Sequence, residues 1–366
     1  MILVPMATKI TAITTHRFSF NFMASLWASK VAINLKHGNL SHMSFILEAN
    51  NTKYKRWGWY VLCILCLIIA FMIGQSPLTA VVRKSLDKGL ITQTEAVEIQ
   101  QTANFEVLGL SSALGLLLIL GSFVVAFAML YLFVITVHGR KFKSLITTGN
   151  IRWERIGFAF IVWFVLAALT ECILYFRDPD VYHVAIDWST WLPLMLVVLF
   201  VLPLQTSFEE LFIRGYLLQG IGLAANRPWI AVVTTALIFG LMHLGNPEIK
   251  QFGHGIMMFY YISVGVFLAT LTILDDGLEL ALGIHAATNI YGAGFVTFTG
   301  SAIQTDALIK VELINPVWLV ALSYLSMIGF IFLVLSRYHL QNWKVLFAPV
   351  RPIPLPISEN SMNIES

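Results

Sequence analysis

The segment FVLPLQTSFEELFIRGYLLQGIGLAA, residues 200–225, places ionisable side chains in the middle of an apolar stretch: Glu209, Glu210 and Arg214. A charge in hydrocarbon costs several kcal/mol, so such residues are either paired or used in chemistry. On a helix, Glu210 and Arg214 lie four residues apart on one face, which predicts an intramembrane ion pair. Glu209 lies about 100° around the helix from Glu210. We therefore expect Glu209 to have another partner, because one arginine cannot easily satisfy both carboxylates.

Two later apolar stretches carry histidines that are candidates for that partner. FGLMH places Phe239 and His243 four residues apart, and HAATN does the same for His285 and Asn289. Counted along ideal helices from the adjacent turns, Glu209 and His243 lie roughly 20 Å deep and Asn289 roughly 18 Å, with His285 one turn shallower. These side chains are therefore expected to meet in one layer of the bundle.

Such a layer has the chemistry of a hydrolase. A carboxylate beside a neutral imidazole can hold and deprotonate a water, while a second imidazole and an amide can donate to an oxyanion. A zinc interpretation stays open, because Glu209, His243 and His285 could supply three protein ligands and leave one position for water. A serine mechanism is disfavoured, because Ser207 has no convincing base.

The ordered set of motifs resembles one family of membrane proteins. The similarity lies in Glu209-Glu210-x-x-x-Arg214, Phe239-x-x-x-His243 and His285-x-x-x-Asn289. These resemble the three motifs of the CPBP family, which comprises type II CAAX prenyl endopeptidases and the bacteriocin-processing or self-immunity proteins also called Abi. The similarity covers about residues 155–300, and all three motifs are present without substitution.

The resemblance implies an intramembrane endopeptidase. In it, Glu209 and His243 would activate a water, and His285 with Asn289 would form the oxyanion hole. The site-shaping residues would be Glu210, Arg214 and Phe239. The family has been described both as metalloproteases and as metal-independent enzymes. We favour the metal-free version and expect no cofactor, with zinc as the alternative.

Composition places these helices in a membrane. Hydrophobic residues make up 58% of the 366 residues and charged residues 12%, and the net charge of +3 is too small and scattered to indicate a nucleic-acid partner. We predict an all-α polytopic bundle of about eight spans, integral to a bacterial cytoplasmic membrane, with the lipid bilayer and an unknown membrane-associated protein or peptide substrate as partners. The apolar runs are 57–74, 110–137, 156–176, 190–222, 229–245, 256–274, 278–298 and 316–336.

The connecting segments predict the topology. If the amino end of the first run is cytoplasmic, most Lys and Arg of the connections fall on the cytoplasmic side, which predicts that both termini are inside. The run 190–222 is too long for one untilted span, so we expect it to be strongly tilted or bent near Pro203. Residues 75–107 are expected to form the one sizeable loop, with a short amphipathic helix in it.

The chain divides into five parts. We expect residues 1–42 to be a non-native or disordered extension, although their lack of acids also resembles an organellar transit peptide. Residues 43–155 hold the N-terminal membrane helices and a cytoplasmic loop, 156–300 the CPBP-like catalytic core, and 301–340 the final membrane helix. Residues 341–366 are predicted to be a disordered cytoplasmic tail.

Other polar residues have less specific interpretations. Glu171 is expected to reach the membrane surface or to pair with Arg177. Glu248 and His254 are expected to be solvated in an outer loop. Two further functions remain as alternatives to the protease: a non-catalytic scaffold or bacteriocin self-immunity factor, and a proton-coupled transporter, since acids and histidines in a bundle also form proton relays.

Overall fold

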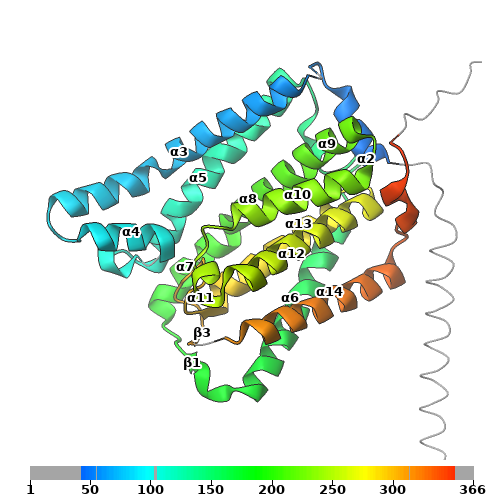
Figure 1. Ribbon diagram of the computed structural model, residues 1–366. Coiled ribbons are helices and arrows are strands. Elements are labelled where there is room, and N and C mark those ends of the chain that lie inside the picture. The colour runs from blue at the N-terminus through cyan, green and yellow to red at the C-terminus, as the bar shows by residue number, and fades with distance from the viewer. Residues whose placement is uncertain (1–42, 55, 103–104, 313, 351–366) are drawn as a thin grey trace, which may run out of the picture.

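The computed structural model describes residues 43–54, 56–102, 105–312 and 314–350. It is a helical bundle (Figure 1). The helices are α2 (Ser44–Leu47), α3 (Trp57–Asp87), α4 (Gln93–Thr102), α5 (Ser112–Leu132), α6 (Trp153–Arg177), α7 (Trp188–Phe200), α8 (Leu202–Glu210), α9 (Leu218–Ala225), α10 (Pro228–Met242), α11 (Pro247–Phe252), α12 (His254–Asp275), α13 (Glu279–Gly294) and α14 (Pro316–Arg337). The predicted all-α polytopic fold is confirmed.

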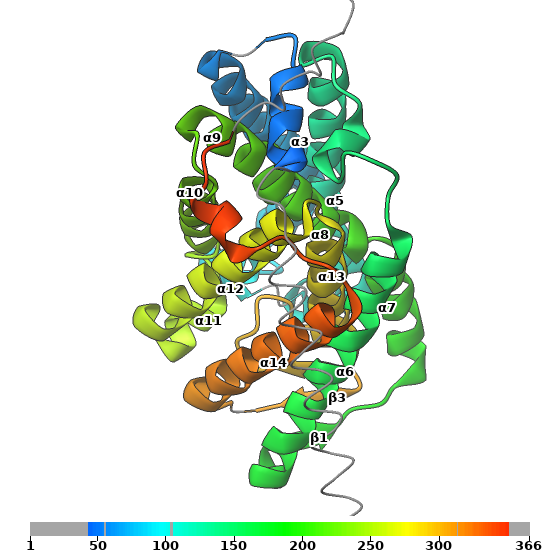
Figure 2. The same cartoon turned by 90° about the vertical axis from the view of Figure 1, so that its right-hand side faces the viewer.

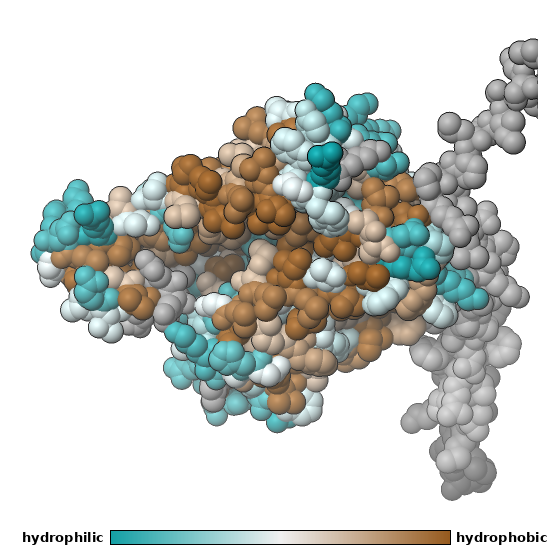
Figure 3. Space-filling view, turned by 45° about the horizontal axis from the view of Figure 1, so that its top comes forward, coloured by the Kyte–Doolittle hydropathy of each residue, from teal (hydrophilic) through white to brown (hydrophobic). Residues whose placement is uncertain are grey.

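Each of the eight apolar runs contains a helix, but they differ in length. Within the described residues, six apolar helices are long enough to cross a membrane, and the segment Trp188–Ala225 counts as one of them. The helices α10 and α13, which occupy the fifth and seventh runs, are shorter, with 15 and 16 residues. Hydrophobic side chains cover much of the flank of the molecule, and hydrophilic ones gather toward its extremities (Figure 3).

The first helix is longer than its apolar run. Residues 75–107 were expected to be mainly loop, but α3 continues to Asp87 and only then turns into α4. The extension is helical because Leu78 and Val82 bury their side chains in a small core with Ile91 and Ile99 of the following segment. The hairpin of α3 and α5 therefore projects from the rest of the bundle, with α4 at its tip (Figure 1).

Segments that are far apart in the sequence meet at one end of the bundle. The backbone N–H of Lys53 donates to His138 O, that of Leu278 to Ile146 O, and that of Gln341 to Leu274 O. These are segments predicted to be cytoplasmic, so their common location agrees with the predicted topology; the sidedness of the termini stays a prediction. In Figure 2 this end faces the viewer.

At the opposite end, three short strands form the small sheet of the structure. They are β1 (Tyr182–Val184), β2 (Val296–Phe298) and β3 (Ile309–Val311), with β3 in the middle, antiparallel to β1 and parallel to β2. The sheet connects the end of α6 to the segment between α13 and α14. It therefore anchors the loop that follows α13, which lines the cavity described below.

The two ends of the chain were both predicted to be disordered or non-native. The interpretations of residues 1–42 and 351–366 lie outside the described residues. The predicted disordered tail begins with an ordered segment, because Trp343–Phe347 form a short 3-10 helix with Val345 buried. Its apolar side chains pack against the core of the bundle, which a purely polar tail could not do.

Candidate functional site

The segment that carries the acidic motif is interrupted twice. The helix α7 ends at Phe200, and α8 begins at Leu202 with Pro203 in its first turn. Proline fits there because its missing N–H is not needed at a helix start. The long run was expected to be strongly tilted or bent near Pro203, and the structure interrupts the helix at Val201, next to that proline. Glu210 ends α8, and a π-helical stretch, Leu211–Leu217, follows before α9. Single π turns often occur at functional sites.

Glu210 and Arg214 form the predicted ion pair. Nη1 of Arg214 donates to Oε1 of Glu210 at 2.7 Å, and both side chains are fully buried. The guanidinium of Arg214 also lies over the ring of Phe239, 4.1 Å from its centroid. A cation over an aromatic face is stabilised by the ring quadrupole. Phe239 thus connects α10 to the charged pair.

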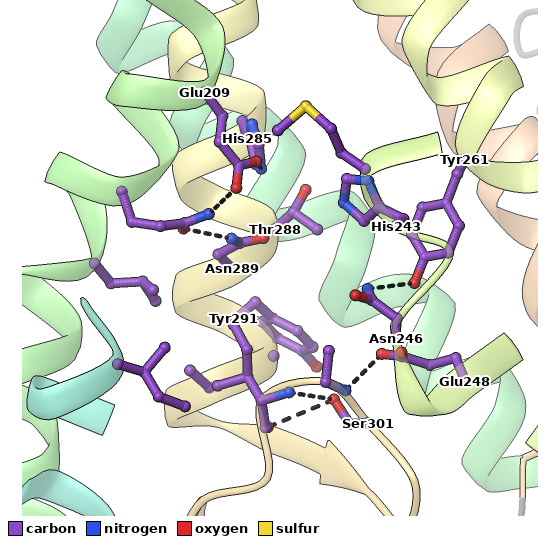
Figure 4. A pocket seen from close by; sticks show the side chains of 18 of the residues that line it. Glu209, His243, Asn246, Glu248, Tyr261, His285, Thr288, Asn289, Tyr291 and Ser301 are labelled. Carbon is purple, nitrogen blue, oxygen red and sulfur yellow. Dashed lines mark hydrogen bonds and ion pairs between the residues drawn. The ribbon is translucent and has the colours of Figure 1, made fainter. Parts of the chain in front are cut away.

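His285, on α13, is held by the same carboxylate. The distance from its Nδ1 to Glu210 Oε1 is 2.7 Å. A carboxylate only accepts hydrogen bonds, so Nδ1 carries the proton and donates it. The other ring nitrogen, Nε2, lies 3.6 Å from Oε2 of Glu209. Glu210 therefore orients His285, and Glu209 lies on its other side (Figure 4).

Gln205 connects Glu209 to Asn289. Its Nε2 donates to Glu209 Oε1 at 2.5 Å, and its Oε1 accepts from Asn289 Nδ2 at 3.0 Å. Sequence reasoning missed Gln205. The available signal was its position four residues before Glu209, on the same helical face.

His243 is the C-cap residue of α10. It contacts Phe239, whose ring in turn contacts His285. Nδ1 of His243 donates to the carbonyl of Phe239 at 2.7 Å, because a carbonyl can only accept. This sets the tautomer and leaves Nε2 as the nitrogen with a lone pair. The ring stacks on Tyr261, with 4.3 Å between centroids, and tilts against Phe239 at 4.4 Å. Tyr261 is a second residue that sequence reasoning missed.

Most of these side chains line one cavity, whereas Glu210, Arg214 and Phe239 lie behind its wall. Its volume is about 800 Å³, and its wall includes Glu209, His243, His285 and Asn289 together with Gln205. The structure thus brings the four predicted polar groups from three segments to one space. Apolar side chains of α3 and α5 line another part of the same cavity, so it extends from the polar groups toward the hairpin.

Helix α13 can place its histidine here because it packs very closely on α6. A Cβ atom on Gly283 would lie 2.4 Å from Ile156 O and 2.7 Å from Ala159 Cβ. Only glycine allows the two backbones to approach this closely. His285 is two residues further along the chain, so its position depends on this contact.

Comparison with known proteins finds a family similarity in this region. Residues 187–291 match the sequence model of the type II CAAX prenyl endopeptidase Rce1-like family. The site lies within this matched region, which is similar to the Rce1-like family. The match runs from the start of α7 into α13 and contains every predicted site residue, so the resemblance inferred from the motifs is confirmed.

One curated relative extends the similarity. The uncharacterized protein YyaK of Bacillus subtilis (strain 168) is 33% identical over 182 residues, which is 49% of this chain and 60% of that protein. The chain thus spans about 60% of the length of the curated relative it matches. No solved structure matches the chain at a significant level.

Two acids near the candidate site differ from the sequence-based expectation in their burial and in their hydrogen-bond partners. Glu248 was expected to be solvated, but only 7% of it is exposed. Glu171 was expected to reach the surface or pair with Arg177, but its Oε1 accepts from the hydroxyl of Tyr182 at 2.5 Å. Arg177 instead lies over the ring of Trp318. The fold brings the ends of α6 and α10 to the cavity wall, which local sequence does not reveal. His254 is exposed, as predicted.

The arrangement of possible metal ligands at the candidate site bears on the zinc alternative. Within the described residues, His, Cys, Asp and Glu side chains form no group of three or more with the geometry to hold an ion. In the present arrangement Glu209, His243 and His285 contact other protein groups: Gln205, Phe239 and Glu210.

Proposed function

We propose that this chain is an intramembrane endopeptidase that hydrolyses a peptide bond of a membrane-associated substrate with a water activated by glutamate and histidine. The observation that carries the proposal is the position of Glu209. Its carboxylate lies in the wall of a cavity, 3.6 Å from His285, while the neighbouring Glu210 is neutralised by Arg214. The similarity to the Rce1-like family supports the same class of activity.

Glu209 is the group that takes the proton of the water. Oε1 is held by Gln205, so the carboxylate is fixed by a hydrogen bond and its Oε2 lies toward His285. His243 contributes the lone pair of Nε2, because its Nδ1 proton is used by the Phe239 carbonyl. A carboxylate and a neutral imidazole that share a water can deprotonate it as it attacks the carbonyl carbon.

His285 and Asn289 are the groups that stabilise the oxyanion. Fixed donors directed at the position of developing charge are often the largest contribution to catalysis. Glu210 fixes the ring of His285 and Gln205 fixes the amide of Asn289, so neither donor has to reorganise during the reaction. Because Nδ1 of His285 already donates to Glu210, His285 acts as the imidazolium and donates to the oxyanion from Nε2. Glu209 then passes its proton to the leaving amine, and the peptide C–N bond of the tetrahedral adduct breaks. No covalent bond forms between the protein and the substrate.

We favour hydrolysis without a metal, because each of the two histidines already has a role. The alternative places zinc on Glu209, His243 and His285. The two versions differ in a simple measurement: metal content of the purified protein and cleavage in the presence of a chelator. Metal-free hydrolysis predicts unchanged turnover, whereas stoichiometric zinc with chelator-sensitive turnover would establish the alternative.

The shape of the cavity indicates where the substrate lies. Its apolar part is lined by side chains of the hairpin, among them Ile68, Phe71 and Phe123. An apolar segment of a membrane-associated polypeptide fits such a wall, since burial of apolar surface contributes about 25 cal/mol per Å². We place the protein in the cytoplasmic membrane of a bacterium, where it would act on a substrate within or beside the bilayer.

The test compares peptides of membranes that contain either the wild-type protein or the Glu209→Gln variant at equal abundance. Mass spectrometry of the membrane fraction should find new peptide termini with the wild type only. The Glu209→Gln variant keeps the side-chain volume and loses the basicity, so it is the matched control. Identical peptide sets, with both proteins inserted and folded, would contradict the protease assignment and leave a binding or scaffold function.

A further inference from the structure

A buried carboxylate lies in the cavity wall away from the proposed catalytic groups. Glu248 is in the first turn of α11, five residues after His243 in the chain, and 7% exposed. Its Oε1 accepts a hydrogen bond from the backbone N–H of Ala302 at 2.7 Å. Its Oε2 is buried and has no hydrogen bond of standard geometry among the described residues, although the hydroxyl of Tyr261 lies near the carboxyl. An ionised oxygen in this state is costly, so a partner that fills the gap would be stabilised.

The surroundings of Glu248 tie it to the site. The side chain of Asn246 donates to the hydroxyl of Tyr261 at 3.2 Å, and the ring of Tyr261 stacks on His243. In Figure 4, Asn246 and Glu248 lie on the same side of the cavity as His243 and Tyr261. A group bound at Glu248 would therefore lie a short distance from the proposed scissile bond.

Apart from the two histidines of the site, the charged side chains in the cavity wall are acidic. The lining of the cavity includes Glu171, Glu209 and Glu248, and none of the described residues that line it is Lys or Arg. Burial raises the pKa of the Glu248 carboxyl, as expected where no cation is at hand to stabilise its charge. The aromatic side chains of Tyr260 and Tyr291 also line the cavity. Acidic and aromatic groups together are complementary to a cation.

We propose that the part of the cavity around Glu248 is a subsite for a cationic group of the substrate, a Lys or Arg side chain a few residues from the scissile bond, which pairs with Oε2 of Glu248. This inference rests on the proposed function and adds a substrate class to it: an apolar peptide segment that carries one basic residue. Glu171, on the wall formed by α6, adds to the negative field.

A purely structural role for Glu248 makes a different prediction. In that case the side chain only anchors the loop after α13 through the N–H of Ala302. The Glu248→Gln variant separates the two roles, because the amide oxygen can still accept from Ala302 while the charge is removed. An anchoring role depends on the acceptor, whereas the subsite depends on the charge.

The first arm of the experiment measures cleavage by the full-length protein in lipid vesicles. The probes are acetylated, amidated Leu-Ala peptides with one Lys at successive positions, each paired with a peptide that has norleucine there. We expect Lys to raise kcat/KM about tenfold or more at one position, the factor typical of a hydrogen bond to a charged group. The Glu248→Gln variant should lose this preference.

The control for this arm is Glu312→Gln. Glu312 is an exposed acid whose side chain pairs with His183 and does not line the cavity. Its replacement should leave the preference for Lys unchanged. Equal cleavage of the Lys and norleucine peptides by the wild type, or a preference that survives in Glu248→Gln, would overturn the subsite.

The second arm does not depend on cleavage. Binding of the same peptide pairs is measured by thermal shift on the Glu209→Gln variant and on the double variant Glu209→Gln with Glu248→Gln. We expect the Lys peptide to bind about tenfold more tightly than its norleucine partner in the first protein only. If the wild type cleaves nothing but this difference remains, the proposed function fails and the subsite stands. Equal binding by the Glu209→Gln variant refutes the subsite.

Discussion

Two clusters of buried charges in this protein resemble each other in composition and differ in surroundings. One lies at the end of the bundle, where Arg152 and Arg155 contact Asp275 and Glu279. Arg152 contacts both acids, at 3.1 Å and 2.5 Å, and Arg155 pairs with Asp275. Two cations thus meet two carboxylates that are fully buried. None of these four residues lines the cavity.

The second cluster lies at the site, where one arginine pairs with only one of two adjacent carboxylates. Glu210 forms an ion pair with Arg214 and accepts a hydrogen bond from Nδ1 of His285. Glu209 has no arginine of its own, and its carboxylate lies in the cavity wall beside the Nε2 of His285. The cluster at the bundle end, with equal numbers of cations and carboxylates, holds α6, α12 and α13 together. The cluster at the site has one carboxylate more than it has arginines, so Glu209 lies beside the cavity without a paired arginine. A general base that deprotonates a water needs this arrangement.

The largest expected difference between the clusters is in catalysis. Glu209→Gln should lower the cleavage rate by about 10²–10⁴-fold, the usual contribution of a general base, with normal folding. Asp275→Asn should lower thermal stability and leave the rate per folded molecule near that of the wild type. Turnover normalised to folded protein tests both. A large loss of rate in Asp275→Asn without loss of stability would remove the distinction.

Asn289 sharpens the comparison within the site. Asn289→Ala should lower kcat by about 10²–10³-fold with little change in KM, because a donor to the oxyanion acts mainly in the transition state. It should also release the amide of Gln205, which now holds both Asn289 and Glu209. Steady-state kinetics on a mapped substrate measures the effect. A change confined to KM would assign Asn289 to substrate binding instead.

Arg214 tests the stability side of the comparison. Arg214→Ala leaves the fully buried Glu210 without its cation, which typically costs about 3–5 kcal/mol of folding free energy. Changing both residues to Gln should restore part of that stability, since no unpaired charge remains. The equivalent change at the bundle end, Arg155→Ala, should cost less, because Arg152 still pairs with both Asp275 and Glu279. Thermal unfolding in detergent compares these variants. Equal stability of Arg214→Ala and the double variant would argue against the pairing.

The smallest expected effect is at the contact between α6 and α13. Gly283→Ala should destabilise the protein by about 1–3 kcal/mol, because the new methyl group overpacks the interface. It should also reduce activity, since α13 carries His285. The control is Gly157→Ala on α6, where a Cβ would meet nothing within 4 Å. Equal behaviour of the two variants would show that the close approach is not needed.

Much of the site was predictable because its residues are costly where they are. Charges and histidines are rare in apolar helices, so the spacing of Glu210 and Arg214 predicted their pair directly. Depth along ideal helices predicted that His243, His285 and Asn289 reach the same layer as Glu209, and all four line one cavity. These inferences needed only the rise per residue and the membrane as solvent.

Other features were missed because they depend on distant segments. Gln205 resembles an ordinary polar residue until Asn289 of α13 lies beside it. Glu248 has the local sequence of a solvated turn, but it is buried by the loop that contains Ala302. The length of α3 was underestimated because its last turns are stabilised by a core shared with the segment around α4.

The amino-acid sequence therefore determined the membrane environment, the helical class, the ion pair and the identity of the motif residues, because each follows from local spacing and from the cost of polar groups in hydrocarbon. Tertiary structure alone decided which imidazole faces Glu209, that Gln205 joins the site, and that Glu248 is enclosed in the cavity wall. The physical reason is that these contacts join residues up to 84 positions apart in the chain. Their geometry depends on how closely α13 packs against α6 and on where the loop after α13 returns.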